Sequence, residues 1–319
     1  MKRVHHIWGC FILFIPLLYL TACVESDEGE PTGFLTVEIT DAPLDRASAV
    51  VLQLASIEIK PAFDDEVILF EYEAPGMGFE LDKYTRGITL TLIPSLALTP
   101  GEYEHLRLNF NAEPGLSDDS FIVINDATHP IALVDNPETK LTVSEIDGAA
   151  GFTIAHNQKT RIVVDFDLRK SLSSPALGSE DYMLDPVLRA ATAEGSSVVQ
   201  GLIDNEILAD TKCELSNDLI SGRAIFLFSG VNAFPEDDDA LNTALRRNEY
   251  ASSSRIAETT DGSSTLYVYN LSFLPPGNYS MVVACENPEE TGDSNNRDFR
   301  ELTRGSVTLS AGVTTRVDF

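Results

Sequence analysis

The short motif with the clearest chemical potential is Thr40-Asp41-Ala42-Pro43. Asp41 could serve as a catalytic or metal-binding carboxylate, which would make the chain a hydrolase-type enzyme that works with loop carboxylates. An Asp in such a turn also commonly accepts hydrogen bonds from its own turn through its side chain. A deep pocket that holds Asp41 with a second carboxylate would favour the enzyme, whereas an Asp41 folded against its own turn would favour a structural role.

Other residues suited to catalysis or metal binding are few. Beyond residue 22 the histidines are His105, His129 and His156, and none has a His, Cys or acidic neighbour at a metal-ligand spacing. The chain has no G-x-S-x-G motif and no Cys/His signature of a nucleophilic enzyme. We therefore predict no catalytic residues, no metal and no cofactor.

Acidic residues outnumber basic ones, with 50 Asp+Glu against 22 Lys+Arg and a net charge of −28. Such a chain repels phosphate backbones, so we expect no nucleic-acid partner. Acidic clusters lie at Asp64-Asp65-Glu66, Asp118-Asp119, Glu236–Asp239 and Glu289-Glu290. Loop carboxylates can bind Ca²⁺, but none of the clusters follows the EF-hand pattern. We interpret them as solvated loops, and calcium-dependent adhesion stays an alternative.

The N-terminus has the parts of a secretory signal. Lys2 and Arg3 precede an apolar stretch, Ile7–Leu20, that is shorter than the roughly 20 residues of a membrane-spanning helix. The sequence Leu20-Thr21-Ala22-Cys23 that follows resembles the lipobox of bacterial lipoproteins. This resemblance implies a signal peptide over residues 1–22, cleavage before Cys23, and attachment of the mature chain to a membrane through acylated Cys23. An ordinary secretory signal that happens to contain a cysteine is the alternative.

A short tether is predicted over residues 23–32, because the polar, acidic residues after Cys23 can bury nothing. Nine extended residues reach roughly 30 Å. Cleavage would remove two of the 22 basic residues and no acid, so the net charge would change from −28 to −30. Val24, rather than Asp, follows Cys23, which by the enterobacterial sorting rule favours the outer membrane.

Two cysteines are left once Cys10 leaves with the signal peptide and Cys23 is acylated. They are Cys213 and Cys285, and in an exported chain such a pair commonly forms a disulfide. We predict this bridge, which would connect the irregular segment 204–221 to a strand. Two buried free thiols, or a thiol that pairs with a partner protein, are the alternatives.

From Phe34 onward the chain consists of short alternating apolar runs separated by Gly, Pro, Asn and Asp, which is typical of an all-β protein. Leu35, Val37 and Ile39 are an example. The alternation changes parity after Leu54, which predicts a β-bulge near Ala55-Ser56 or a strand buried on both faces. A helix is predicted only over residues 235–247, where acids come first and arginines last.

Two antiparallel β-sandwich-like domains are expected after the tether, over residues 33–192 and 197–319. Small, turn-prone residues over 191–197 mark the boundary. The sequence Leu98-Thr99-Pro100-Gly101-Glu102-Tyr103 is echoed by Leu274-Pro275-Pro276-Gly277-Asn278-Tyr279. Shared hairpin chemistry and domain duplication both explain this echo.

The segment Gly33–Pro43, together with Leu98–Leu108 and Leu184–Arg189, resembles the bacterial lipoprotein domain known as domain of unknown function 4382. This resemblance covers residues 33–192 and brings no catalytic residues with it. The turns at Asp261-Gly262 and Leu274–Tyr279 resemble those of the carboxypeptidase-regulatory or transthyretin-like β-sandwiches, whose members are usually non-catalytic. We therefore expect a lipid-anchored cell-envelope protein that is not an enzyme and has a binding or structural role.

Overall fold

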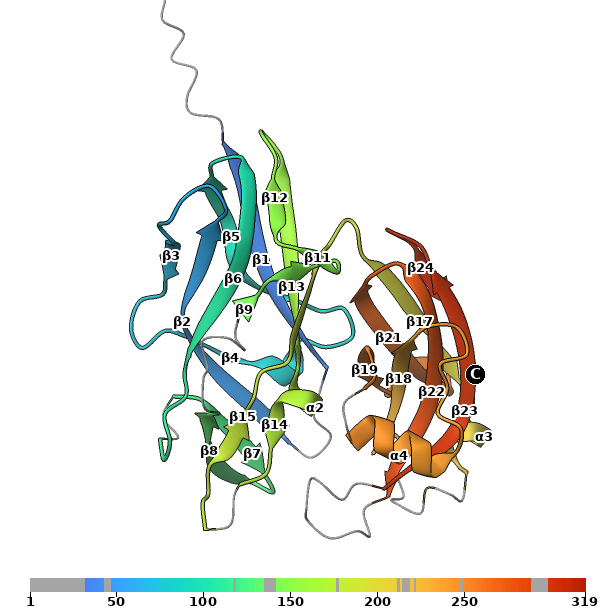
Figure 1. Cartoon of the computed structure of the whole chain (residues 1–319). Coiled ribbons are helices and arrows are strands. Elements are labelled where there is room, and N and C mark those ends of the chain that lie inside the picture. Colours follow the sequence, from blue (N-terminus) through green and yellow to red (C-terminus); the bar gives the residue numbers. More distant parts are fainter. Residues whose placement is uncertain are drawn as a thin grey trace, which may run out of the picture. The chain divides into compact units, whose positions relative to one another are not determined.

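The computed structural model describes residues 32–42, 47–116, 119–134, 142–175, 178–210, 213, 219–220, 222–246, 249–287 and 298–319. The predicted signal peptide, Cys23 and the tether up to residue 31 lie outside the described residues, as do Pro43, Arg46, Asp118 and Glu289-Glu290. The described residues belong to one compact unit. The fold is all-β and sandwich-like, as predicted (Figure 1).

The first pair of sheets is built from the first half of the chain. Its six-stranded sheet has the order β11-β10-β16-β13-β1-β5, and its ten-stranded sheet follows the path β12-β6-β2-β7-β8-β15-β14, with β3 and β4 on β2 and β9 on β6. The elements are β1 (Gly33–Ala42), β2 (Ala49–Pro61), β3 (Ile68–Glu71), β4 (Met77–Glu80), η1 (Leu81–Lys83), β5 (Leu90–Leu98), β6 (Gly101–Asn111), β7 (Phe121–Ile124), β8 (Ala127–Leu133), β9 (Thr142–Val143), β10 (Glu145–Ile146), β11 (Ala149–Ala150), β12 (Phe152–Ile154), β13 (Lys159–Asp167), α2 (Leu168–Ser171), β14 (Leu172–Ser173), β15 (Tyr182–Leu184) and β16 (Leu188–Thr192).

Alternation along the strands explains how this pair of sheets buries its core. Leu35, Val37 and Ile39 are fully buried on one face of β1, because side chains at every second position point to the same side. The β-bulge predicted near Ala55-Ser56 is present, since Leu54 pairs with Phe110 whereas Ser56 pairs with Asn109.

The second pair of sheets contains the rest of the chain and has its own hydrophobic clusters. Its sheets have the orders β20-β21-β17-β24 and β19-β18-β22-β23. The elements are β17 (Ser197–Ile203), α3 (Asn205–Leu208), β18 (Arg223–Ser229), α4 (Asp238–Arg246), β19 (Ser252–Arg255), β20 (Ala257–Asp261), β21 (Ser264–Leu274), β22 (Gly277–Asn287), β23 (Asp298–Leu309) and β24 (Thr314–Arg316).

The expectation of antiparallel sheets needs one correction. Most pairings are antiparallel, but β1 pairs with β13, β10 with β16, β8 with β15 and β17 with β24 in parallel. The β1–β13 pairing joins residues more than 120 positions apart, and the long intervening chain permits a parallel crossover that a tight hairpin could not make.

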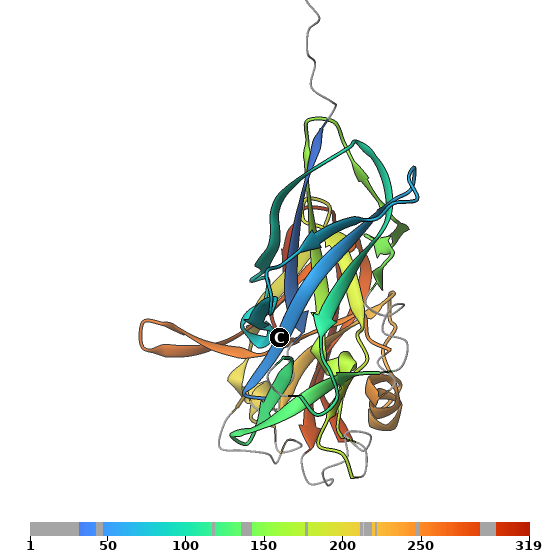
Figure 2. The same cartoon turned by 90° about the vertical axis from the view of Figure 1, so that its left-hand side faces the viewer.

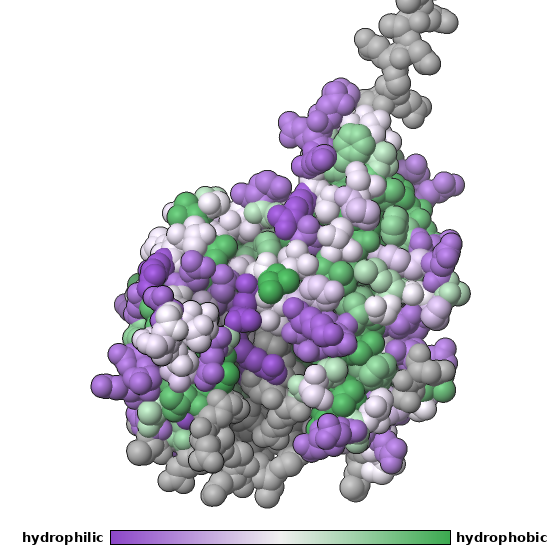
Figure 3. All heavy atoms as spheres, turned by 180° about the vertical axis from the view of Figure 1, so that it is seen from behind, coloured by the Kyte–Doolittle hydropathy of each residue, from purple (hydrophilic) through white to green (hydrophobic). Residues whose placement is uncertain are grey.

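The predicted helix is α4, which begins three residues later than expected and is described up to Arg246. It begins at Asp238 because the side chain of Asp237 accepts a hydrogen bond from the backbone N–H of Ala240 at 2.8 Å. Leu241 and Leu245 are buried against the β18–β22 sheet. No helix in the described part of the chain is both long and apolar enough to cross a bilayer. Hydrophilic and hydrophobic side chains are interspersed on the face seen in Figure 3.

The two echoed turns share one hydrogen bond. The Tyr103 hydroxyl donates to the carbonyl of Thr99 at 2.8 Å, and the Tyr279 hydroxyl donates to the carbonyl of Pro275 at 2.7 Å. Both rings are buried, so each ring anchors its turn to a core while its polar end stays satisfied. Shared turn chemistry accounts for this arrangement, and so would duplication.

Candidate functional site

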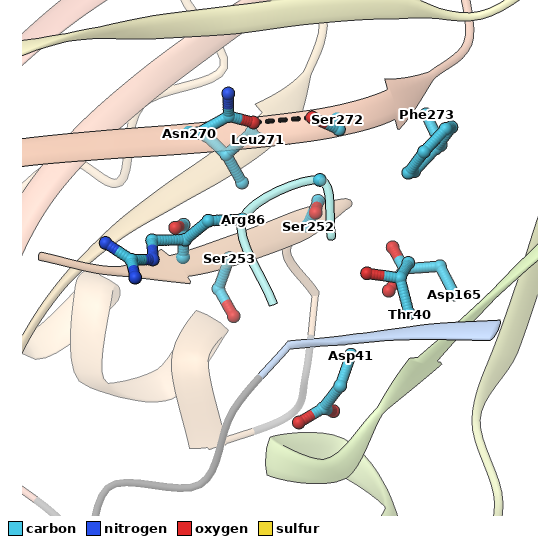
Figure 4. Close-up of a pocket in the computed structure, with 12 residues that line it drawn as sticks. Thr40, Asp41, Arg86, Asp165, Ser252, Ser253, Asn270, Leu271, Ser272 and Phe273 are labelled. Carbon is cyan, nitrogen blue, oxygen red and sulfur yellow. Dashed lines mark hydrogen bonds between the residues drawn. The ribbon is translucent and has the colours of Figure 1, made fainter. Parts of the chain in front are cut away.

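The ends of β1 and β13 bring three carboxylates close together. In this parallel pairing Thr40 lies opposite Asp165, and Asp41 lies opposite Phe166. Because side chains alternate, Thr40 and Asp165 share the outer face of the sheet, whereas Asp41 is on the same face as the core residues Val37 and Ile39. Figure 4 shows the Asp41 side chain directed away from Thr40 and Asp165.

Asp41 is almost completely buried, with 5% of its surface exposed. Its Oδ1 atom accepts a hydrogen bond from the backbone N–H of Leu168 at 3.2 Å, and its Oδ2 atom accepts none from the described residues. Burial, followed by repulsion from Asp167 and Asp165, raises the pKa of Asp41 well above its usual value. The turn that follows Asp41 lies outside the described residues, so the expected bond to that turn stays a prediction. Among the described residues, the carboxylate holds the start of α2.

Asp167 and Lys170 form a second buried pair at the same place. The Asp167 side chain caps α2 by accepting from the backbone N–H of Lys170 at 3.1 Å, and Lys170 Nζ lies 3.7 Å from Asp167 Oδ2. Burial raises the pKa of Asp167 to about 6 and lowers the pKa of Lys170. Lys170 also reaches the second pair of sheets, because Nζ donates to the carbonyl of Tyr250 at 2.5 Å and lies 4.1 Å from the ring centroid.

Arg189 joins the two pairs of sheets through Asp165. Its Nη2 donates to the Asp165 carboxylate, and its Nη1 donates to the carbonyl of Phe273 in β21 at 2.7 Å. Arg189 therefore forms an ion pair with Asp165. The guanidinium group thus uses two nitrogens for two different acceptors, so it compensates the charge of Asp165 and connects distant strands.

The cavity at this seam is small. Thr40, Asp41, Arg86 and Asp165 line it from one side, and residues 252–254 and 270–273 line it from the other. Its volume of about 20 Å³ is room for one water molecule. Two carboxylates therefore border one cavity, as the enzyme hypothesis requires. However, they point to opposite faces of the sheet and the cavity cannot hold a substrate, so the described groups connect and stabilise the two pairs of sheets.

Sequence reasoning missed one ion pair on the same face of the first sheet. Arg161 Nε and Nη2 donate to the two carboxylate oxygens of Glu38 at 2.8 and 2.7 Å, and the Thr89 hydroxyl donates to the same carboxylate at 2.5 Å. The hydrogen bond from Arg161 is the main reason that the pKa of Glu38 is lowered. A local sequence pattern could not have assigned to Arg161 a partner 123 positions away.

His105, His129 and His156 lie on two different strands and a turn. His105 is in β6, where burial lowers its pKa, and His129 is in β8 with its ring centroid 5.5 Å from that of Tyr182. His156 lies beside Asn157, with the two side-chain nitrogens 3.1 Å apart. Within the described ranges, no group of three or more His, Cys, Asp or Glu side chains is placed to hold a metal ion.

Within the described part of the chain, the acidic clusters lie in loops and at the start of α4, and some of their side chains accept hydrogen bonds from nearby backbone. Asp64 accepts from the backbone N–H of Glu66 at 3.1 Å. Asp119 accepts from those of Ser120 and Glu113 at 2.6 and 3.1 Å. These carboxylates therefore have a structural use as turn caps.

The predicted disulfide is present between Cys213 and Cys285, whose Cα atoms lie 6.0 Å apart. Cys285 is in β22, opposite Arg223 of β18, and both cysteines are buried. The bridge therefore connects the segment before β18 to the interior of the sheet.

Comparison with solved structures finds several distant likenesses. The TIE protein of Bacillus anthracis is 9% identical with a TM-score of 0.19, over 90% of this chain and 34% of that one, so the chain spans about a third of its length. A putative cell adhesion protein from Bacteroides fragilis is 10% identical with a TM-score of 0.21, over 89% and 92%. GBS52, the minor pilin of Streptococcus agalactiae, is 11% identical with a TM-score of 0.17, over 89% and 94%. Scores this low carry no argument about fold or function.

None of the curated proteins compared with the chain matches it. A family model does match, and its description is "Domain of unknown function (DUF4382)". The match runs over residues 32–186, just under half of the 319 residues, and it ends before the second pair of sheets begins. The family resemblance predicted for the first half of the chain is thus confirmed, while the transthyretin-like resemblance of the second half stays a prediction.

Proposed function

We propose that the protein is a cell-envelope lipoprotein, anchored by acylated Cys23, with a non-catalytic binding or structural role. The observation that carries the proposal is the disulfide between Cys213 and Cys285. Disulfides form and persist in oxidising compartments outside the cytosol, and the lipobox-like Leu20–Cys23 segment supplies a route to one. Val24 after the cysteine favours the outer membrane as the site of the anchor.

The structural use of the buried charges supports the non-catalytic part of the proposal. Asp41 holds the start of α2, Asp165 pairs with Arg189, and Asp167 caps a helix and pairs with Lys170. A carboxylate committed to such contacts would have to release them before it could bind a metal or transfer a proton to a substrate.

The anchor can be tested by metabolic labelling. Cells that produce the full chain are supplied with an alkynyl palmitate analogue, and the label on the purified protein is measured. Cys23→Ala should remove the label and leave residues 1–22 uncleaved, because the acylated thiol is needed before cleavage. Cys10→Ala is the matched control, since Cys10 lies in the apolar segment and should label like the wild type. Equal labelling of the wild type and Cys23→Ala would refute the anchor.

A further inference from the structure

A second cavity lies at the base of the hairpin formed by β20 and β21, which projects from the second pair of sheets (Figure 2). Its volume of about 360 Å³ is within the range of small-molecule sites. Ile203, Tyr267 and Phe319 form apolar parts of its wall, and Asp204 and Asp318 contribute carboxylates. The cavity is thus large enough for a ligand, unlike the water-sized cavity at the seam.

The wall of this cavity is held in place by the last residues of the sequence. They run parallel to β17: the backbone N–H of Phe319 donates to the carbonyl of Leu202 at 2.9 Å, and the N–H of Asp204 donates to the carbonyl of Phe319 at 2.8 Å. The Phe319 ring packs near Tyr269, with centroids 6.2 Å apart. Both aromatic side chains of the wall, Tyr267 and Phe319, are partly buried against the core, so they are positioned before any ligand arrives.

The charges at this cavity are mainly negative. Asp204 Oδ1 caps α3 by accepting from the backbone N–H of Glu206 at 2.9 Å. Asp318 accepts from the N–H of Leu202 at 2.8 Å and pairs with Arg316, and these contacts lower the pKa of Asp318. Arg316 thus compensates the charge of Asp318, and among the described residues no ion pair is found for Asp204.

A further acid lies next to the aromatic wall. Glu258 of β20 pairs directly with Tyr267 of β21, so both side chains lie on the same face of the sheet. Anionic ligands would be repelled by Asp204, Glu258 and the strongly acidic chain as a whole. A cation would be stabilised both by electrostatic attraction to the carboxylates and by contact with the faces of the aromatic rings.

We propose that this cavity binds a small organic cation, with an ammonium or guanidinium group on a short apolar body. The apolar body would contact Ile203, Tyr267 and Phe319, and the charged group would lie near Asp204. The assignment names a ligand class for the binding role proposed above, so it rests on that role. It does not depend on the lipid anchor.

The test is titration calorimetry on the full chain, purified as the cells produce it, in a non-ionic detergent at low ionic strength. The probes are choline and its uncharged isostere 3,3-dimethylbutan-1-ol, which has the same shape without the charge. Choline should bind at least tenfold more tightly than the isostere, and its affinity should fall as salt is added. Agmatine, which has a guanidinium group, should also bind.

Asp204→Asn is the decisive variant, because Asn still caps a helix while the charge is removed. It should weaken choline binding about fivefold to tenfold, and Tyr267→Leu should weaken it by a similar factor. Asp261→Asn is the matched control, since Asp261 is an exposed acid of the same hairpin that does not line the cavity, and its affinity should equal that of the wild type. Near-ultraviolet circular dichroism identifies any variant that has lost its fold.

Several outcomes would overturn the assignment. They are equal binding of choline and the isostere, no binding of either cation, or a folded Asp204→Asn with wild-type affinity. Preference for a neutral monosaccharide would replace the organic cation with a sugar as the ligand. Palmitate labelling tests the anchor separately from calorimetry. A negative calorimetry result would therefore not contradict the anchor, and an unlabelled protein would not contradict the cation site.

Discussion

Removal of the disulfide should destabilise the second pair of sheets by about 4 kcal/mol. The bridge joins residues 72 positions apart, and closing a loop of that length in the unfolded chain accounts for about 4 kcal/mol in the chain-entropy model. The change is Cys213→Ala combined with Cys285→Ala, which removes the cross-link without leaving a buried polar group. Because both cysteines are buried, the loss of their packing should add to the effect rather than offset it.

The assay is thermal and urea unfolding of the double variant beside the wild type, with and without reductant. A loss of about 4 kcal/mol should lower the unfolding temperature of the second pair of sheets by on the order of 10 °C. Reduced wild type should behave like the double variant, and intact mass should fall by about 2 Da on oxidation of the reduced chain. Two thiols that react with an alkylating agent in unreduced, denatured protein from the native envelope would refute the reasoning. So would identical unfolding of the two proteins.

Three further changes test other parts of the fold. Gly201→Ala should cost at least about 2 kcal/mol and loosen the end of the chain, measured by hydrogen exchange, because a Cβ atom there would lie 1.6 Å from the carbonyl oxygen of Val317. Gly277→Ala, whose Cβ atom would meet nothing closer than 3.6 Å, is its control and should unfold like the wild type. Arg189→Gln should cost about 3 kcal/mol in urea unfolding because it leaves a largely buried carboxylate without its cation, and a loss under 0.5 kcal/mol would contradict that role. Asp167 has a pKa of about 6 in the folded protein, above its ordinary value of 3.8, so the folded state binds this proton more tightly and its contribution to stability should fall by up to about 3 kcal/mol as pH rises from 4 to 6. The stability of Asp167→Asn relative to the wild type, measured by urea unfolding across that range, should therefore rise with pH, and a flat difference would contradict the assigned pKa.

Features that depend on neighbouring residues were predictable from the sequence. The alternation of Leu35, Val37 and Ile39 predicted both the strand and its buried face, and the parity change after Leu54 predicted the bulge. The same holds for α4, where a capping acid precedes an apolar stripe. Strand and helix periodicities are local properties of the chain, so a short window contains the information.

The disulfide was predictable for a different reason. Once the signal-like segment and Cys23 are set aside, only Cys213 and Cys285 are left, so composition and expected compartment suggested the pair. The short distance between their Cα atoms is a property of the folded sheet, and no spacing in the sequence specifies it.

Tertiary structure decided which distant residues meet. The Asp41 motif was visible in the sequence, but its hydrogen-bond partner, Leu168, is 127 positions away and depends on the parallel pairing of β1 with β13. The cavity beside Asp204 likewise gathers residues from β17, β21 and the end of the chain. Alternation determines which side of a strand a residue occupies, while the choice of neighbouring strand comes from packing the whole core. This pairing of strands produces a cavity beside Asp41 that has room for one water molecule and a larger cavity at Tyr267.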